Sequence, residues 1–122
     1  MHPCHIVIVD DDDAIRSVIT AIAREAVPSA LVTEHTSSLH ALQEVESGAA
    51  DLLITNFQMP DMDGRALVEK IRGEKNAIPI IMVSGSDEAR MMGENAGIDC
   101  FVSKNVLHSA LAEAIRSLIE AR

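Results

Sequence analysis

The fold of this chain can be worked out from residues 51–64, DLLITNFQMPDMDG. Leu52 to Thr55 form an apolar run that predicts a buried strand, and Asn56 stands at the end of this run, before a turn rich in proline, aspartate and glycine. In open parallel sheets, ligand chemistry gathers at such strand ends. A carboxylate placed here could act as an anionic nucleophile, whereas the neutral Asn56 amide is a poor one.

Further apolar runs recur along the chain and alternate with helical patterns. The runs are Ile6–Val9, Leu31–Thr33, Leu52–Thr55, Ile80–Val83 and Phe101–Val102. Apolar residues at helical spacing follow each run, least markedly over Asp87–Asn95, where Gly93 interrupts the pattern. This alternation predicts an α/β fold, in which a doubly wound five-stranded parallel sheet carries helices on both faces.

The composition predicts one acidic domain. With 122 residues, 48% of them hydrophobic, the chain can bury one core, so we expect residues 1–122 to form a single domain with no output domain. The net charge of −9 and the presence of only two aromatic residues argue against binding to nucleic acid or to anionic membranes. The sequence has no basic leader and no run of about 18 apolar residues, which predicts a cytoplasmic protein.

The cysteines and histidines show no metal-ligand spacing. Cys4 and Cys100 each lie beside a strand-like run, which predicts small buried or edge hydrophobic side chains. The histidines are scattered, and we assign them no role: His2, His5, His35, His40 and His108.

Polar residues follow four of the predicted strands. They are the aspartates of residues 10–13 after the first strand, Asn56 after the third, Ser84 after the fourth and Lys104 after the fifth. Because the carboxyl ends of parallel strands share one edge of the sheet, we expect these side chains to form one constellation.

Asp10 and Asp11 have the chemistry of a divalent-cation site. Two adjacent carboxylates offer hard oxygen ligands suited to Mg²⁺ or Mn²⁺, and the backbone carbonyl of Gln58 and waters would complete the shell. The alternative is that the acidic run only begins the first helix, and for Asp12 and Asp13 we favour this capping role.

Six short motifs occur in order along the chain. They are Val9-Asp10-Asp11, the MPDMDG turn of residues 59–64, Ser84-Gly85, Ala96-Gly97, Phe101 and Lys104. Together they resemble the receiver domain of two-component response regulators, over essentially the whole chain. The resemblance implies a CheY-like, flavodoxin-like (βα)5 three-layer sandwich. It also implies metal-aided phosphoryl transfer from a histidine kinase to an aspartate, with a conformational shift passed to the face of the fourth helix, fifth strand and fifth helix.

The resemblance also implies roles for three residues. Ser84 corresponds to the hydroxyl that contacts the phosphoryl group, Lys104 to the lysine that bridges to the phosphorylated aspartate, and Phe101 to the aromatic switch. Each has a structural alternative: Ser84 as a turn residue, Lys104 as an ion-pair partner of Asp10 or Asp11, and Phe101 as a core side chain.

The chain departs from the family pattern at three places. Asn56 replaces the acceptor aspartate, which removes the nucleophile and one negative charge, so Mg²⁺ binding is expected to be weakened. Asn105 stands where the family usually has proline, and it is predicted to cap the last helix. The stretch from Ser84 to Lys104 is about two residues shorter than the family's usual spacing.

No neighbouring residue replaces the missing carboxylate. Thr55 points to the opposite face of its strand. Asp61 and Asp63 are predicted to shape the turn and to start the third helix.

These features predict a pseudo-receiver, a single-domain signalling protein that acts through protein contacts without aspartyl phosphorylation. Its partner would be a histidine kinase or another signalling protein, docking around Met91, Met92, Phe101 and Val106, or a second copy of the chain on the same face. Ordinary core packing is the alternative for these side chains.

The second interpretation is a phosphorylatable receiver in which Asn56 stands for a natural aspartate. An enzyme is not predicted, because no residues combine a nucleophile, a base and an oxyanion donor. A nucleotide or flavin binder is not predicted either, because no glycine-rich loop follows the first strand.

Overall fold

The computed structural model describes residues 3–121 and contains one five-stranded parallel sheet. The strands are β1 (His5–Val9), β2 (Leu31–His35), β3 (Leu52–Asn56), β4 (Ile80–Ser84) and β5 (Cys100–Ser103). Their order is β2-β1-β3-β4-β5, so the strand order reverses beside β1, and all neighbours are parallel. The predicted doubly wound five-stranded sheet is confirmed.

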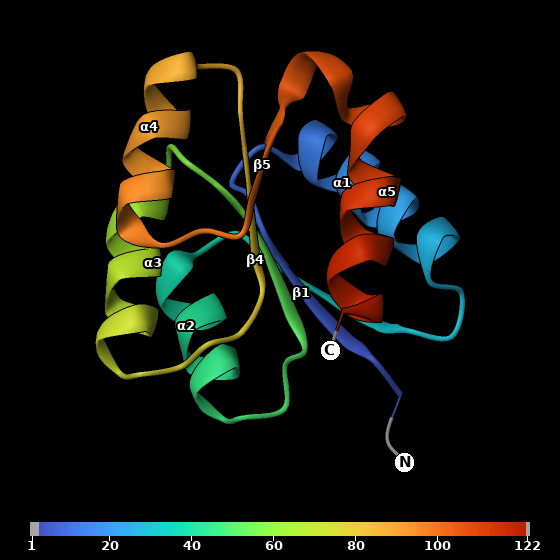
Figure 1. The fold of residues 1–122 in the computed structure, drawn as a ribbon, viewed down its shortest axis with the longest axis horizontal. Helices are drawn as coiled ribbons and strands as arrows, with labels where there is room; N and C mark the ends of the chain where they lie inside the picture. The colour runs from blue at the N-terminus through green and yellow to red at the C-terminus, as the bar shows by residue number, and fades with distance from the viewer. Residues whose placement is uncertain (1–2, 122) are drawn as a thin grey trace.

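Helices cover both faces of this sheet. They are α1 (Asp13–Ala26), α2 (Ser38–Glu46), α3 (Gly64–Gly73), α4 (Asp87–Ala96) and α5 (Leu107–Glu120), with a short 3₁₀ helix, η1 (Lys104–Val106), before α5. Figure 1 shows α1 and α5 on one side and α2, α3 and α4 on the other. The helix predicted over Asp87–Asn95 is present as α4, in spite of Gly93.

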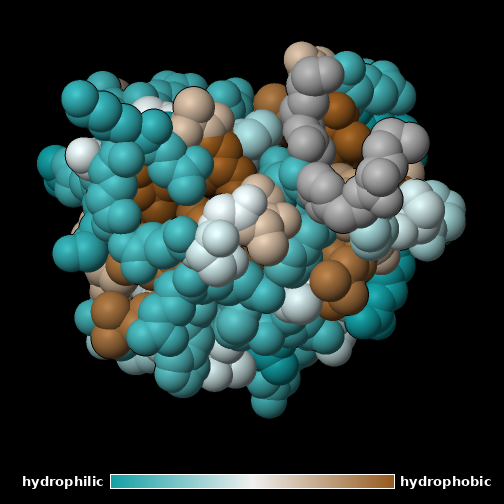
Figure 2. All heavy atoms as spheres, turned by 90° about the horizontal axis from the view of Figure 1, so that it is seen from below, coloured by the Kyte–Doolittle hydropathy of each residue, from teal (hydrophilic) through white to brown (hydrophobic). Residues whose placement is uncertain are grey.

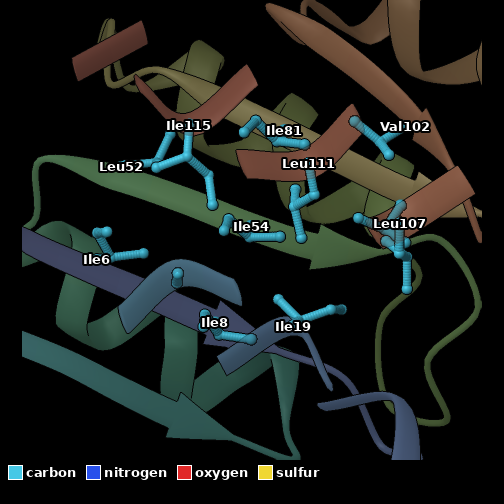
Figure 3. Packing of buried hydrophobic residues seen from close by; sticks show 12 residues of the cluster. Ile6, Ile8, Ile19, Leu52, Ile54, Ile81, Val102, Leu107, Leu111 and Ile115 are labelled. Carbon is cyan, nitrogen blue, oxygen red and sulfur yellow. The ribbon is translucent and has the colours of Figure 1, made fainter. Parts of the chain in front are cut away.

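The three central strands are buried on both faces. Every residue of β1, β3 and β4 is buried, which explains their continuous runs of valine, isoleucine and leucine. One cluster lies under α1 and α5, where Ile19, Leu111 and Ile115 pack on side chains of the sheet such as Ile8 and Ile54 (Figure 3). A second cluster lies on the other face, under α2 and α3.

Side chains define the starts of four helices. Asp12 caps α1, as predicted, and accepts the N–H groups of Ala14 and Ile15 at 2.9 and 3.1 Å. Ser37, Asp63 and Ser86 are the caps of α2, α3 and α4. A side-chain oxygen at such a position accepts N–H groups that have no partner within the helix.

The predicted cap at Asn105 is wrong. Asn105 lies inside η1, where its own N–H donates to Ser103 Oγ at 3.2 Å, and α5 begins after Val106 without a side-chain cap. The reason is that the chain after β5 turns first into a 3₁₀ helix, which Ser103 caps, and this moves the start of α5 beyond the reach of Asn105.

Both cysteines lie at the margin of the hydrophobic core. Cys4 and Cys100 are half-buried against the core cluster under α1 and α5, which agrees with the prediction of small edge hydrophobic side chains.

Figure 2 shows the end of the molecule seen from below, where hydrophilic side chains surround small separate apolar groups. Within residues 3–121, no helix is both long and apolar enough to cross a membrane.

Candidate functional site

Strand register brings the predicted polar residues to one edge of the sheet. Val9 of β1 pairs with Thr55 of β3, so Asp10 and Asn56 follow side by side. On the other side of β3, Asn56 pairs with Val83, the residue before Ser84. Ser84 in turn pairs with Ser103, which precedes Lys104. Neighbouring strands lie about 4.8 Å apart, so Asp10, Asn56, Ser84 and Lys104 lie close to one another at the carboxyl edge of the sheet, and we call this group of four residues the acid pocket.

Asp10 is the buried acid of this acid pocket. Its side chain is 0% exposed, and Oδ1 accepts the Asp12 N–H at 2.9 Å. Burial raises the pKa of Asp10, although the Asp12 N–H and the positive charge of Lys104 act in the opposite direction. Its Oδ2 is buried and has no hydrogen-bond partner among the described residues. Asp10 therefore carries a costly charge that a nearby cation would stabilise.

Asn56 is held by its own turn. Its side chain is 5% exposed, and Nδ2 donates a hydrogen bond of 2.6 Å to the backbone carbonyl of Gln58. The neighbouring Thr55 hydroxyl donates to the Asn56 carbonyl at 2.9 Å. The Asn56 amide thus donates to the Gln58 carbonyl, the oxygen that was predicted to be a ligand of a cation.

Gly64 makes this turn sterically feasible. A Cβ atom at this position would collide with the backbone oxygen of Asn56 and lie 3.0 Å from the Cα atom of Phe57. The Gly64 N–H donates to the Phe57 carbonyl at 2.6 Å, which closes the turn. The glycine is therefore required by close approach of two backbone segments.

The predicted site residues Ser84, Lys104 and Asp11 differ in how far they are buried. Ser84 is 6% exposed, and its hydroxyl oxygen accepts the Ser86 N–H at 3.2 Å. Lys104 is half-buried at the start of η1, close enough to Asp10 to lower its pKa by its charge. Asp11 is exposed to solvent.

The donor set fits a divalent cation only in part. Asp10, with its unpartnered Oδ2, has the chemistry of a ligand, and Asp11 lies beside it. The Gln58 carbonyl already accepts a hydrogen bond from an N–H group of Asn56. Across residues 3–121, no group of three or more His, Cys, Asp or Glu side chains is arranged to hold a metal ion.

The residues predicted to form a docking surface differ in exposure. The ring is half-buried, and the Arg90 guanidinium lies 4.5 Å from its centroid, within cation–π range. Met91 is 67% exposed and Val106 is 44% exposed, so core packing does not account for these two side chains, whereas Met92 is half-buried.

Two features of the site were missed by sequence reasoning. Asp63 caps α3 as predicted, but Asp61 does not act on α3; its carboxylate binds the start of α2, including the Ser37 hydroxyl at 2.8 Å. His5 and His35, to which no role was assigned, both contact Glu44 of α2. No spacing within the sequence indicates these contacts, because they join different strands and helices.

Comparisons with known proteins identify the family. The family model described as "Response regulator receiver domain" matches residues 6–116. The cyclic di-GMP phosphodiesterase response regulator RpfG of Xanthomonas campestris is 30% identical over 122 residues, which cover 97% of this chain and 32% of that protein. Among the curated relatives it matches, the chain spans between 32% and 56% of their length.

Solved structures agree with this family. The receiver domain of Francisella response regulator 1452 has a TM-score of 0.86 at 23% identity, covering 98% of both chains, and shows the same fold. A CheY-like receiver domain protein of Methanospirillum hungatei has a TM-score of 0.79 at 26% identity, covering 99% of this chain and 100% of that one. Receiver domains are signalling modules that interact with histidine kinases and other signalling proteins, and they typically bind Mg²⁺ at an acidic pocket. The chain belongs to the response regulator receiver domain family of two-component signal transduction.

Proposed function

We propose that this protein is a pseudo-receiver, a receiver domain that signals by docking a partner without aspartyl phosphorylation. The observation that carries the proposal is the hydrogen bond of 2.6 Å from Asn56 Nδ2 to the Gln58 carbonyl. In this reading Asn56 holds the position of the phospho-acceptor. Its amide is neutral, it is a poor nucleophile, and its N–H groups rather than an anionic oxygen serve the turn.

The proposed metal site is correspondingly weak. Mg²⁺ prefers several oxygen ligands in near-octahedral geometry, and here Asp10, Asp11 and the Gln58 carbonyl are the candidates. The Asn56 amide already satisfies that carbonyl, and it brings no negative charge to the acid pocket. When bound, the ion would offset the charge of Asp10, which the Lys104 ammonium otherwise offsets from a distance.

The docking surface proposed for a partner is the face of α4, β5 and α5 around Phe101. Met91 and Val106 are exposed there, and Arg90 covers the Phe101 ring. Exposed methionine adapts its shape to different partners, which suits a protein-contact surface. The proposed partner is a histidine kinase or another signalling protein, and a second copy of this chain is the alternative occupant.

The alternative function is a phosphorylatable receiver in which an aspartate naturally occupies position 56. One observation favours it: Asp10, Ser84 and Lys104 stand at the ends of β1, β4 and β5, at the same edge of the sheet as Asn56. The two functions differ in a single chemical property, the ability of residue 56 to form an acyl phosphate.

Intact-protein mass spectrometry after incubation with acetyl phosphate and Mg²⁺ tests the proposal. Neither this chain nor a matched Asn56→Gln control is expected to gain a base-labile phosphoryl group. Asn56→Asp, treated in parallel, reports whether the rest of the acid pocket supports phosphorylation, and Asn56→Asp combined with Asp10→Asn shows whether that depends on the buried acid. Base-labile phosphorylation of the chain as it stands would overturn the pseudo-receiver proposal.

A further inference from the structure

Three polar side chains from β1 and β2 meet at the carboxylate of Glu44, which lies on α2. Glu44 Oε1 accepts hydrogen bonds from the Thr33 hydroxyl at 2.6 Å and from His35 Nε2 at 2.7 Å. His5 Nε2 lies 3.0 Å from Thr33 Oγ1 and 3.3 Å from Glu44 Oε2. Because a carboxylate only accepts, the hydrogen of the His35 contact sits on Nε2. The cluster thus ties both strands to α2.

Glu44 is suited to hold this cluster as an anion. Burial alone would raise the pKa of Glu44, but the hydrogen bonds from Thr33 and His35, with the nearby imidazoles, outweigh burial and lower it. Hydrogen bonds to an ionised acceptor are stronger than those between neutral groups. Glu46, on the same helix, interacts with Glu74, the residue that follows α3, and takes no part in the cluster.

The cluster is joined to the acid pocket through the end of β2. His35 is the last residue of this strand, and its carbonyl oxygen accepts the Asp10 N–H at 3.1 Å. Strand β2 is an edge strand, paired only with β1, and several of its residues are partly exposed. The position of its last residue therefore depends on the pairing with β1 and on the contact between the His35 ring and Glu44.

We propose that Glu44 is a positioning residue for the acid pocket, acting through His35 on the backbone of Asp10. The proposal deepens the proposed function, because it rests on Asp10 being part of the functional site. It assigns the α2–β2 side of the molecule a role in setting pocket geometry, so that a contact made at this side would be transmitted to the acid pocket.

The cluster offers a conservative and a disruptive substitution at the same position. Both strong hydrogen bonds end on Oε1, so Glu44→Gln keeps an oxygen acceptor for Thr33 and His35. Glu44→Ala removes both bonds. Glu46→Ala is the matched control, since it truncates a glutamate of the same helix whose side chain interacts with Glu74, away from the cluster.

Two-dimensional ¹H–¹⁵N NMR of the full chain reads the acid pocket directly. The backbone signal of Asp10 and the side-chain amide pair of Asn56 are the reporters, and the pair is assigned by its loss in Asn56→Asp. At each reporter, Glu44→Ala and His35→Ala are expected to change the chemical shift in the same direction as each other. Glu44→Gln and Glu46→Ala are expected to leave both chemical shifts unchanged.

Two outcomes would overturn the proposal. In one, Glu44→Ala lowers thermal stability while both reporters stay in place, which would make Glu44 a purely structural residue. In the other, Glu44→Gln and Glu44→Ala shift the reporters equally, so that the Oε1 acceptor does not matter. If Glu44→Ala does not fold, His35→Ala with unmoved reporters overturns it equally. These signals do not depend on phosphorylation, so failure here is distinguishable from failure of the pseudo-receiver proposal.

Discussion

The Asp61 carboxylate, in the loop after β3, accepts a hydrogen bond of 2.8 Å from the Ser37 hydroxyl at the start of α2. It also accepts the backbone N–H groups of Ser38 at 3.3 Å and Leu39 at 3.1 Å. Burial acts to raise the pKa of Asp61, but these hydrogen bonds outweigh it and lower the pKa to about 2. Asp61 therefore joins the loop that contains Gln58 to the N-terminus of α2 and caps this helix in addition to Ser37.

Asp61→Asn is expected to lower the free energy of unfolding by about 1 kcal/mol at neutral pH, the usual contribution of a capping side chain. A carboxyl whose pKa is lower in the folded than in the unfolded state stabilises the fold above its unfolded pKa. This stabilisation is lost as the pH falls toward about 2. In urea denaturation, the difference in free energy of unfolding between the unmodified chain and Asp61→Asn should therefore be smaller at about pH 3 than at about pH 7.

The surface carboxylate Glu113 provides the control for the Asp61 experiment. It is exposed on α5, so Glu113→Gln should change the free energy of unfolding by no more than about 0.5 kcal/mol. If Asp61→Asn lowers the free energy of unfolding by the same amount at both pH values, the ionised Asp61 carboxylate is not the source of the stabilisation.

Gly64→Ala is expected to destabilise the protein by roughly 1–3 kcal/mol, as overpacking does elsewhere. The added Cβ atom would collide with the Asn56 backbone oxygen, and backbone on both sides leaves no flexible group to move. Thermal denaturation measures the effect. Gly73→Ala is the matched control, because no atom outside its own helix backbone and its chain neighbours lies within 4 Å of its Cβ position among the described residues. Equal melting temperatures for the two variants would contradict the steric argument.

Arg72 is expected to be a major stabilising residue away from the acid pocket. Its guanidinium donates to the carbonyls of Gly97 at 2.9 Å and Ile78 at 2.8 Å and to the Asp99 carboxylate at 2.9 Å. Arg72→Lys offers a single ammonium in place of this planar set of donors. It should lower the free energy of unfolding by about 1–3 kcal/mol in urea denaturation, because one ammonium cannot replace both donors to the partly buried carbonyls of Asn76 and Ile78.

The control for Arg72 is another arginine of α3. Arg65 is exposed and lies 3.6 Å from Glu69 in a surface pair. Such pairs contribute about 0–1 kcal/mol, so Arg65→Lys should be nearly silent. A similar loss in both variants would mean that the hydrogen bonds of Arg72 to the α4–β5 connection carry no special weight.

The sheet could be predicted because its central strands are buried on both faces. Full burial demands continuous apolar runs, and Ile80–Val83 is one example that matches β4 to within one residue. At the exposed edge the signal fades: β2 was predicted to end at Thr33, but it continues to His35, because an edge strand tolerates polar residues.

The candidate site could be predicted as a set of positions but not as a network. Topology alone places Asp10, Asn56 and Lys104 at one edge, since parallel strands share their carboxyl ends. The contacts of Asp61 with α2, and of His5 and Glu44 with each other, join residues far apart in the sequence. Neither period nor spacing encodes such pairs, so only the folded structure reveals them.

Asp10→Asn is expected to stabilise the protein in the absence of divalent ions. The carboxylate is fully buried, its Oδ2 has no hydrogen-bond partner within residues 3–121, and burial raises its pKa. Asparagine has nearly the same shape and keeps an oxygen for the Asp12 N–H. Removing this buried charge, which the Asp12 N–H and Lys104 offset only in part, should raise the free energy of unfolding by about 1–3 kcal/mol in urea denaturation at neutral pH.

Asp11→Asn and added Mg²⁺ complete the Asp10 experiment. Asp11 is exposed, so its substitution should change stability by no more than about 0.5 kcal/mol. An ion that binds only the folded state stabilises it by mass action, so Mg²⁺ should raise the melting temperature of the unmodified chain slightly and that of Asp10→Asn not at all. If Asp10→Asn is instead less stable without divalent ions, Lys104 already compensates the Asp10 charge, and the acid pocket has no need of a cation.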